Sequence, residues 1–242
     1  WARCYGAVVT SATLAIGADF SRFINRIGIA SDNRFTALLS PFNYSEQAVL
    51  KVPMMKTDPR NADDHNDEVA SMLPGVLDGV NGGLVLFASW RQMYRVTEQL
   101  SDSFMSHVMS QGDLGKAEIV SQHKKLVDSG KRSIIFGLAS FAEGIDLPGR
   151  YCDHVVIIKI PFAVPDDPVG ATLSEWIEDN GGNSFQEIMV PDAALKMIQA
   201  CGRLLRTETD TGVISILDRR LVTQRYGALL MNALPPFRRE IA

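Results

Sequence analysis

The chain has 242 residues, of which 46% are hydrophobic and 21% charged, a composition typical of one large soluble globular domain, with or without an appendage. Its net charge of −4 excludes a polycation that coats nucleic acid indiscriminately, but not a protein with a local binding groove. Cys4, Cys152 and Cys201 are far apart and the histidines are isolated, so we expect a reducing compartment, no disulfide framework and no metal site. No apolar run is long enough to span a membrane, and no charged-then-apolar leader opens the chain.

The opening of the chain predicts a strand followed by a helix. Residues 5–10 form an apolar run typical of a buried strand. A strand so near the first residue suggests a chain cut from a larger protein. Residues 19–28 predict a short amphipathic helix that ends at Gly28, and residues 48–52 predict the next strand.

The rest of the chain alternates between strands and helices. An acidic segment, residues 57–67, predicts a solvated loop entering a helix. A metal site there is the weaker alternative, because the Gly and Glu of a calcium loop are missing. Further strands are predicted at residues 84–88, 104–109, 133–136, 155–160 and 212–217, and helices at residues 93–100, 115–129 and 221–230. This alternation predicts an α/β fold with a parallel sheet and helices on both faces. Ligands of such sheets bind outside the carboxyl ends of the strands. The residues expected there are Ser89, Gln111, residues 137–146 and Asp218.

A Pro- and Gly-rich insertion, residues 161–191, lies between the last two predicted strands. Within it, residues 172–178 predict a helix that presents Trp176. We expect the insertion to wrap the sheet or to face a partner domain, and Trp176 to serve packing rather than stacking on bases.

Residues 192–206 predict a helix that ends in a basic cluster. Apolar residues recur there at helical spacing, with Asp192 near the start. Gln199 and Arg203 would lie one turn apart, with Arg206 three residues further on, and Gly202 beside them would let a phosphate approach. Paired guanidinium groups suit the charge on a transferring phosphoryl group. A solvated basic helix end explains the same residues, and this stretch alone does not decide between the two interpretations.

Four segments occur in the order found in helicase motor domains. They are residues 10–14 (TSATL), 84–89 (LVLFAS), 140–149 (SFAEGIDLPG) and 199–206 (QACGRLLR). They resemble motifs III, IV, V and VI of the XPD-like branch of superfamily 2 helicases, and most closely the bacterial DinG family. The resemblance covers nearly the whole chain. It implies the end of a first motor domain at residues 1–14, and a second, RecA-like motor domain at residues 15–242.

The resemblance assigns one half of an ATP site to this chain. Arg203 and Arg206, with Gln199, are implied to stabilise the γ-phosphate as it leaves. Glu143, Gly144, Asp146 and Gly202 are implied to line the nucleotide, with Asp146 aligning the arginines or bonding ribose. Without the last motif, Glu143 and Asp146 would be interpreted as carboxylates that cap a turn.

The resemblance also assigns a DNA side to the same edge of the sheet. Ser140 and Phe141 are implied to touch the DNA backbone, and Ser89 a phosphate. Trp90 either stacks on a base or belongs to the core, and Gln111 is a weaker candidate. The partners implied are single-stranded and forked DNA, the first motor domain and a single-stranded-DNA-binding protein, without a membrane, in the bacterial cytoplasm.

The sequence lacks the other half of the ATP site. It has neither a G-x-x-x-x-G-K-[ST] loop, whose Lys cradles phosphates, nor a D-E-x-H run, whose acid holds Mg²⁺. ATP and Mg²⁺ would therefore be shared with the first motor domain. Any 4Fe–4S cluster of the family would belong to that part too. By itself, the chain is expected to hydrolyse essentially no ATP.

The resemblance therefore implies the C-terminal motor domain of an ATP-dependent DNA helicase that moves 5′→3′ in repair or replication. Two alternatives stay open. One is a non-catalytic nucleic-acid-binding or regulatory domain with a helicase-like fold, and the other is an unrelated doubly wound metabolite enzyme.

Overall fold

The computed structural model describes residues 3, 5–30, 32–163 and 168–242. The chain forms two compact units, Trp1–Ser40 and Pro41–Ala242. The division lies well after the boundary at residue 14 that the motifs predict.

The first unit contains one helix, α1 (Ser21–Ile27), among its described residues. Gly28 ends this helix in the left-handed conformation, with φ of 63°, as predicted. The strand predicted at residues 5–10 is wrong, because this segment is unpaired and Val8 is 91% exposed. An extended segment becomes a strand only where a neighbour accepts its backbone hydrogen bonds, and no strand in the described residues does so here.

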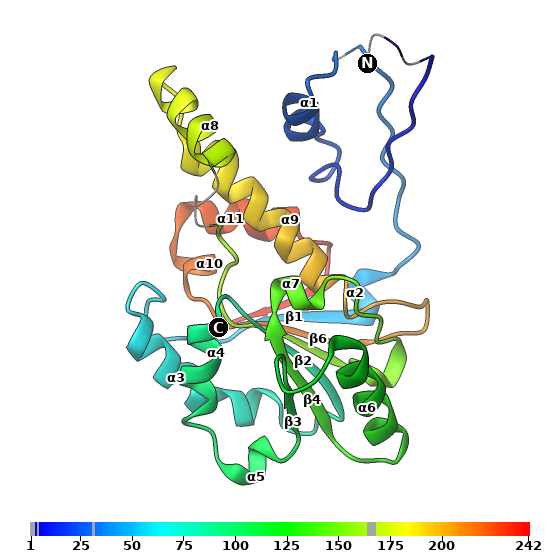
Figure 1. The fold of residues 1–242 in the computed structure, drawn as a ribbon, viewed down its shortest axis with the longest axis vertical. Coiled ribbons are helices and arrows are strands. Elements are labelled where there is room, and N and C mark those ends of the chain that lie inside the picture. The colour runs from blue at the N-terminus through cyan, green and yellow to red at the C-terminus, as the bar shows by residue number, and fades with distance from the viewer. Residues whose placement is uncertain (1–2, 4, 31, 164–167) are drawn as a thin grey trace. The chain divides into compact units, whose positions relative to one another are not determined.

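The second unit is built on one parallel sheet, as predicted (Figure 1). The strand order in the described part is β3-β4-β2-β5-β6-β1-β7. The strands are β1 (Ala48–Val52), β2 (Gly82–Phe87), β3 (Val108–Ser110), β4 (Ser133–Leu138), β5 (His154–Ile157), β6 (Gly212–Ile216) and β7 (Arg238–Ile241). The helices are α2 (Tyr44–Gln47), α3 (Ala62–Val76), α4 (Trp90–Thr97), α5 (Asp102–Met105), α6 (Lys116–Asp128), α7 (Ala139–Ala142), α8 (Pro168–Asp179), α9 (Val190–Cys201), α10 (Arg220–Thr223) and α11 (Arg225–Ala233), with a 3₁₀ turn at Gly149–Tyr151.

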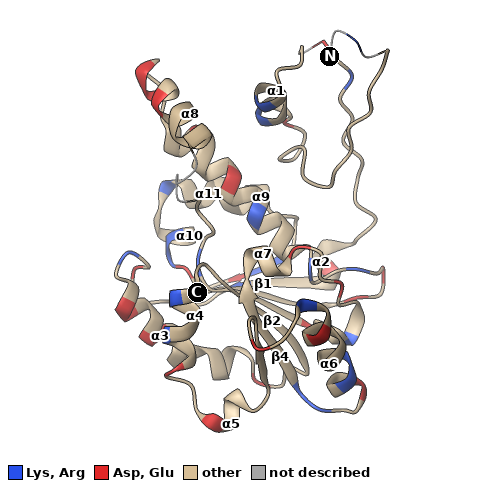
Figure 2. Ribbon diagram, viewed as in Figure 1, with Lys and Arg blue, Asp and Glu red and all other residues tan. Residues whose placement is uncertain are grey.

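The predicted insertion forms a helical arm. Helix α8 is followed by a π-helix, η2 (Phe185–Met189), which leads directly into α9. The helix predicted at residues 172–178 is confirmed as part of α8. Trp176 is 62% exposed in the described structure, so the packing predicted for it is not made here. Three acidic residues, Glu175, Glu178 and Asp179, surround it in the sequence and make the end of α8 acidic (Figure 2).

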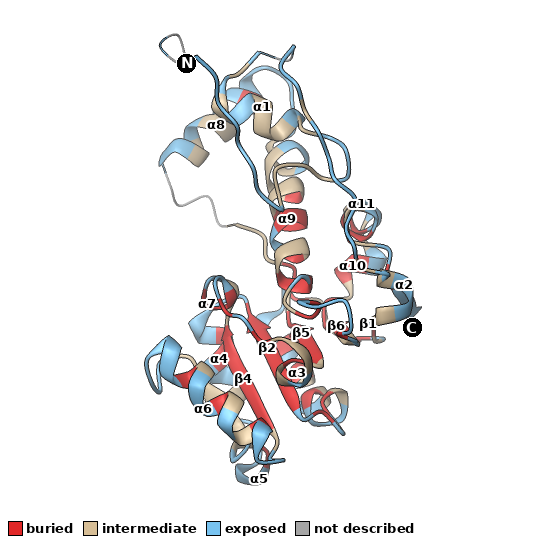
Figure 3. Cartoon of the chain, turned by 90° about the vertical axis from the view of Figure 1, so that its right-hand side faces the viewer, coloured by how far each residue is buried: buried red, intermediate tan, exposed pale blue. Residues whose placement is uncertain are grey.

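Burial on both sides of the central strands explains why helices cover both faces. Val85 and Phe87 of β2 pack with α3 and α4 in one apolar cluster. The alternate residues Leu84 and Leu86 point to the other face and are equally buried, as Figure 3 shows for the central strands. Helices α6 and α9 contact β4 and β5. The continuous apolar runs of the sequence therefore produce a two-sided core.

Three elements differ from the predicted ones. Helix α5 occupies the start of the strand predicted at residues 104–109, which leaves only the short β3. The helix predicted at residues 221–230 is split at Gln224 into α10 and α11. Strand β7 is exposed along its whole length and carries three charged residues, so its sequence gives no apolar signal.

Across the described residues, no helix has the length and apolarity needed to cross a membrane.

We predict that Gly212→Ala destabilises the chain by about 1–3 kcal/mol through overpacking. A Cβ at Gly212 would lie 2.3 Å from the Asp153 carbonyl oxygen and 2.7 Å from Leu204 Cδ1, where β5 and β6 begin. Urea unfolding measures the change. Gly75→Ala in α3 is the matched control, because nothing lies within 4 Å of its Cβ, and it should keep or slightly raise stability. Equal midpoints for wild type and Gly212→Ala would contradict the packing at this point.

Candidate active site at the carboxyl edge of the sheet

The carboxyl edge of the sheet gathers the loops that the sequence selected. Ser89 follows β2, Gln111 follows β3, and Asp218 follows β6. The α7 loop, residues 139–146, follows β4. Because all these strands run in parallel, the loops meet at one edge, as predicted.

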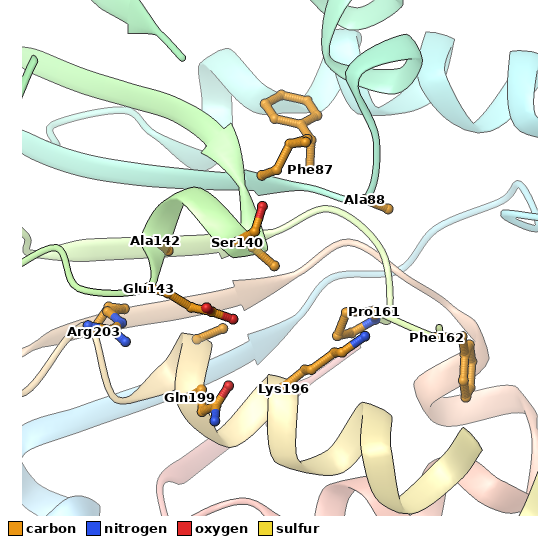
Figure 4. Close-up of a pocket in the computed structure, with 13 residues that line it drawn as sticks. Phe87, Ala88, Ser140, Ala142, Glu143, Pro161, Phe162, Lys196, Gln199 and Arg203 are labelled. Atoms are coloured by element: carbon orange, nitrogen blue, oxygen red, sulfur yellow. The ribbon is translucent and has the colours of Figure 1, made fainter. Parts of the chain in front are cut away.

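A pocket of about 290 Å³ opens between the α7 loop and α9 (Figure 4). Its lining residues are Phe87, Ala88, Leu138, Ala139, Ser140, Ala142, Glu143, Pro161, Phe162, Lys196, Gln199, Ala200 and Arg203. The floor is apolar, and the polar groups come from two opposed elements. The α7 loop supplies Ser140 and Glu143, whereas α9 and the turn after it supply Lys196, Gln199 and Arg203. Lys196 is one helical turn before Ala200, and the sequence analysis missed it.

Helix α9 is shorter than predicted, and its end changes the geometry of the basic cluster. The helix ends at Cys201, and residues 202–204 form a turn. Gln199 therefore lies on the helix, whereas Arg203 and Arg206 lie beyond it. Gly202 has ordinary right-handed angles, φ −66° and ψ −3°, so its backbone conformation does not require glycine. The residue is exposed.

Both arginines are tied to the α7 loop. Arg206 Nε donates to Asp146 Oδ1 at 2.8 Å, and Arg203 Nη1 donates to the Ile145 carbonyl oxygen at 3.0 Å. Asp146 and Arg206 are 62% and 38% exposed, so their ion pair orients the guanidinium and contributes little stability. Burial, followed by the neighbouring Arg206, lowers the pKa of Arg203, yet an arginine stays charged at neutral pH. Asp146 thus holds one of the two arginines, and its role toward the nucleotide stays a prediction.

The α7 loop is braced by Lys116 from the start of α6. Its ammonium donates to the Glu143 carbonyl oxygen and lies 5.4 Å from the centroid of the Phe141 ring. Gly144 adopts φ of 74°, a conformation that favours glycine, so the loop can reverse there. The Phe141 ring is buried against Gly137, where an added Cβ would lie 2.7 Å from Phe141 Cδ1. The ring is thus not presented to DNA.

The remaining DNA candidates differ in exposure and in their partners. Ser89 caps α4, accepting a hydrogen bond from Gln92 N at 3.2 Å. The side-chain oxygen of Gln111 accepts from Leu138 N at 2.9 Å, so this residue joins β3 to the end of β4. Trp90 is 38% exposed and is not part of the core. Ser140 is exposed but lines the same pocket as Glu143, so the proposed DNA and nucleotide residues of this loop are adjacent.

Asp210 is a buried acid that the sequence analysis missed. Its carboxylate accepts hydrogen bonds from Arg206 N at 2.7 Å, Thr207 N at 2.9 Å and the Thr207 hydroxyl. It therefore closes the turn that carries Arg206. Burial alone raises the pKa of Asp210, but the hydrogen bonds from Thr207 and Arg206 outweigh it and hold the pKa below its ordinary value. An acid three residues after a threonine, T-x-x-D, was the available signal.

No group of three or more potential metal-ligating side chains lies together in the described residues. The polar wall of the pocket is an ammonium, an amide and a guanidinium opposite a single carboxylate. Such a donor set fits phosphate oxygens rather than a bare cation.

The sequence profile of the helicase C-terminal domain family matches residues 76–237. The chain belongs to this family. The ATP-dependent DNA helicase DinG of Photobacterium profundum is 42% identical over 246 residues, which cover 100% of this chain and 35% of that protein. DinG of Escherichia coli K12 is 38% identical over 243 residues, which cover 98% of this chain and 34% of that protein. The predicted resemblance to DinG helicases is confirmed, and the chain spans about a third of the length of these curated relatives.

Solved structures of XPD helicases share the fold. A structure titled "XPD_APO" superimposes with a TM-score of 0.61 at 20% identity, covering 82% of this chain and 40% of that one. A structure titled "Structure of S. tokodaii Xpd4" superimposes with a TM-score of 0.61 at 16% identity, covering 88% of this chain and 42% of that one. These matches establish that this chain has the RecA-like helicase fold.

We predict that Asp210→Asn destabilises the chain by about 1–3 kcal/mol at pH 7, since the charged acceptor of several hydrogen bonds is lost. Because the pKa of Asp210 is lowered on folding, the stabilisation is present above about pH 4 and is lost as the pH falls through the folded-state pKa. The stability difference between the two proteins should therefore be constant from pH 7 to 5 and shrink below that range. Urea unfolding at several pH values tests this.

Asp128→Asn is the control, because Asp128 pairs with Arg150 at an exposed position. Its cost should stay below about 1 kcal/mol. An Asp210→Asn difference that is small at pH 7, or that grows in acid, would contradict the assigned role of Asp210.

Proposed function

We propose that this chain is the second motor domain of a DinG-type ATP-dependent DNA helicase, and that it completes an ATP site begun by the first motor domain. The observation that carries the proposal is the attachment of both arginines to the α7 loop beside a phosphate-compatible pocket. Arg206 bonds Asp146 at 2.8 Å, and Arg203 bonds Ile145 O at 3.0 Å. The identity to DinG proteins over the whole chain supports the same assignment.

In this proposal, Arg203 and Arg206 stabilise the charge on the γ-phosphate as it leaves. A guanidinium donates two parallel hydrogen bonds to phosphate oxygens and keeps its charge, so positioning it correctly is most of the catalytic task. Gln199 and Lys196 lie one turn apart on α9 and add neutral and cationic donors to the same pocket. Glu143, Gly144 and Gly202 form the nucleotide side of the loop and turn. ATP and Mg²⁺ are shared with the first motor domain, to which the family's iron–sulfur cluster also belongs.

The DNA path in this proposal crosses the same edge of the sheet. Ser89, Trp90 and Ser140 are exposed there, and Gln111 fixes the end of β3. Phe141 supports the loop from within, so its contribution to DNA contact comes through its backbone. Residues 1–14 end the first motor domain, and the partners are single-stranded and forked DNA, approached in the 5′→3′ direction in the bacterial cytoplasm. A single-stranded-DNA-binding protein is a further partner.

We predict that Arg206→Ala in the full-length protein lowers DNA-stimulated ATP hydrolysis by about 10³-fold or more, the range of other arginine fingers. DNA affinity should remain nearly unchanged. Arg206→Lys should fail to restore turnover, because an ammonium cannot reproduce bidentate donation. A phosphate-release assay, with and without single-stranded DNA, measures the rates.

Arg150→Ala is a matched control. Arg150 is also an exposed arginine, paired with Asp128 at 2.6 Å, but it lies beside Gly82 at the opposite, amino edge of the sheet. Its turnover should equal that of wild type. If Arg206→Ala hydrolyses ATP as fast as the wild type, Arg206 is not an arginine finger. Absence of DNA-stimulated turnover in the wild type would favour the non-catalytic regulatory domain.

We predict that the 242-residue chain alone releases no phosphate from ATP, with or without DNA. Its sequence holds neither the phosphate-cradling Lys loop nor the Mg²⁺-binding acid run. The same phosphate-release assay, run at equal protein concentration beside the full-length enzyme, checks this. Turnover by the chain alone would show that it contains a complete nucleotide site.

A further inference from the structure

Helix α4 presents an exposed aromatic pair at the carboxyl edge of the sheet. Trp90 and Tyr94 lie one turn apart, and their rings stack with centroids 5.8 Å apart and planes 23° from parallel. The two residues are 38% and 56% exposed. Because each ring covers one face of the other, the outer face of the stack is the flat apolar surface that remains accessible.

The start of α4 is held rigidly beneath this pair. Ser89 caps the helix through Gln92 N, and the Gln92 side chain accepts from Ala88 N at 3.1 Å and donates to Asn66 Oδ1 at 3.2 Å. The Trp90 ring lies next to Gly112, where an added Cβ would be 3.4 Å from Trp90 Cη2. Gly112 has φ of 102°, so a side chain at this position is disfavoured twice. The indole is therefore positioned before any ligand arrives.

Basic side chains flank the aromatic pair. Arg91 and Arg95 follow Trp90 and Tyr94 by one residue each, and both are exposed. Arg95 lies 3.5 Å from Glu98, an exposed pair that is easily exchanged for another anion. The nearby Asp113 carboxylate accepts from Ser110 N at 2.8 Å and is thus committed to its own loop. Aromatic faces beside cationic groups are the combination that binds a single nucleic-acid strand.

The surroundings of Trp176 show that exposure of an aromatic ring alone does not make such a site. Trp176 is more exposed than Trp90, at 62%, but it stands among Glu175, Glu178 and Asp179. A polyanion would be repelled there. Of the two exposed tryptophans in the described residues, only Trp90 is stacked on another ring and has basic neighbours.

We propose that the outer face of the stacked Trp90–Tyr94 pair is a stacking platform for a base of single-stranded DNA, with Arg91 and Arg95 on the neighbouring phosphates. This rests on the proposed function and extends it from Trp90 alone to a continuous face of α4. The platform binds bases without reading their sequence, because every base has a face that can stack. It fixes the strand next to Ser89 and adjacent to the loops of the candidate active site.

The experiment measures binding of the full-length protein to two fluorescent oligonucleotides of equal length, oligo-dT and an abasic strand. Tyr94→Ala and Trp90→Ala should each weaken oligo-dT binding by about five-fold or more, the loss of one base stack. Both should bind the abasic strand as wild type does, because phosphate contacts are intact. Tyr94→Phe should retain the oligo-dT affinity, because the ring is kept. Trp176→Ala, the matched control, should change neither affinity.

The arginines have a separate readout. Replacing Arg91 and Arg95 by Gln should weaken binding to both strands and reduce the slope of log affinity against log salt by about 0.7 for each arginine. Unchanged oligo-dT affinity in Tyr94→Ala, or equal losses on both oligonucleotides, would overturn the stacking platform. DNA-stimulated ATP hydrolysis is measured on the same samples. If the wild type retains it while Tyr94→Ala binds normally, the platform fails and the helicase assignment stands.

Discussion

The parallel direction of the strands is the constraint on which the candidate site depends. Parallel pairing requires each strand to return through a crossover, so every carboxyl end in the sheet lies at one edge. Residues as distant in sequence as Ser89, Asp146 and Arg206 are thereby brought to one side of the molecule. The two-sided core of β2, β4 and β5 keeps this edge rigid, which lets exposed and individually weak interactions, such as the Asp146–Arg206 pair, set the direction of a side chain.

Sequence periodicity predicted the sheet well because its strands are buried on both faces and read as continuous apolar runs. It failed where the signal depends on partners elsewhere. Residues 5–10 have the composition of a strand but no neighbour to pair with in the described structure. Strand β7 has a neighbour, β1, but no apolar signal, because its side chains are exposed. Whether a segment forms a strand depends on the neighbouring strand as well as on its own residues, so the sequence of one segment alone does not decide it.

The sequence selected residues that the structure places at one edge of the sheet, but it predicted their local geometry less well. Motif order selected Gln199, Arg203 and Arg206, but helical periodicity extended α9 past its end at Cys201. The apolar residues Leu204 and Leu205 continue the helical pattern, but they are buried beyond the end of the helix. Asp210 stabilises the next turn, which carries Arg206, by accepting hydrogen bonds from Arg206 N and Thr207 N. A nearby side-chain acceptor competes with the helix for the same backbone N–H groups. Which of them wins depends on burial, and burial cannot be seen in the sequence.

Adjacency at the α7 loop gives a physical basis for coupling between nucleotide and DNA in the proposed motor. Ser140 and Glu143 line one pocket, three residues further on Asp146 holds Arg206, and Ile145 O holds Arg203. Movement of either arginine toward a phosphate must therefore displace the loop or break its hydrogen bonds. The loop continues directly from β4, whose neighbour β2 leads into Ser89 and α4. The loop and α4 therefore follow neighbouring strands, so the nucleotide side and the DNA side of the proposed motor lie one strand apart in the sheet.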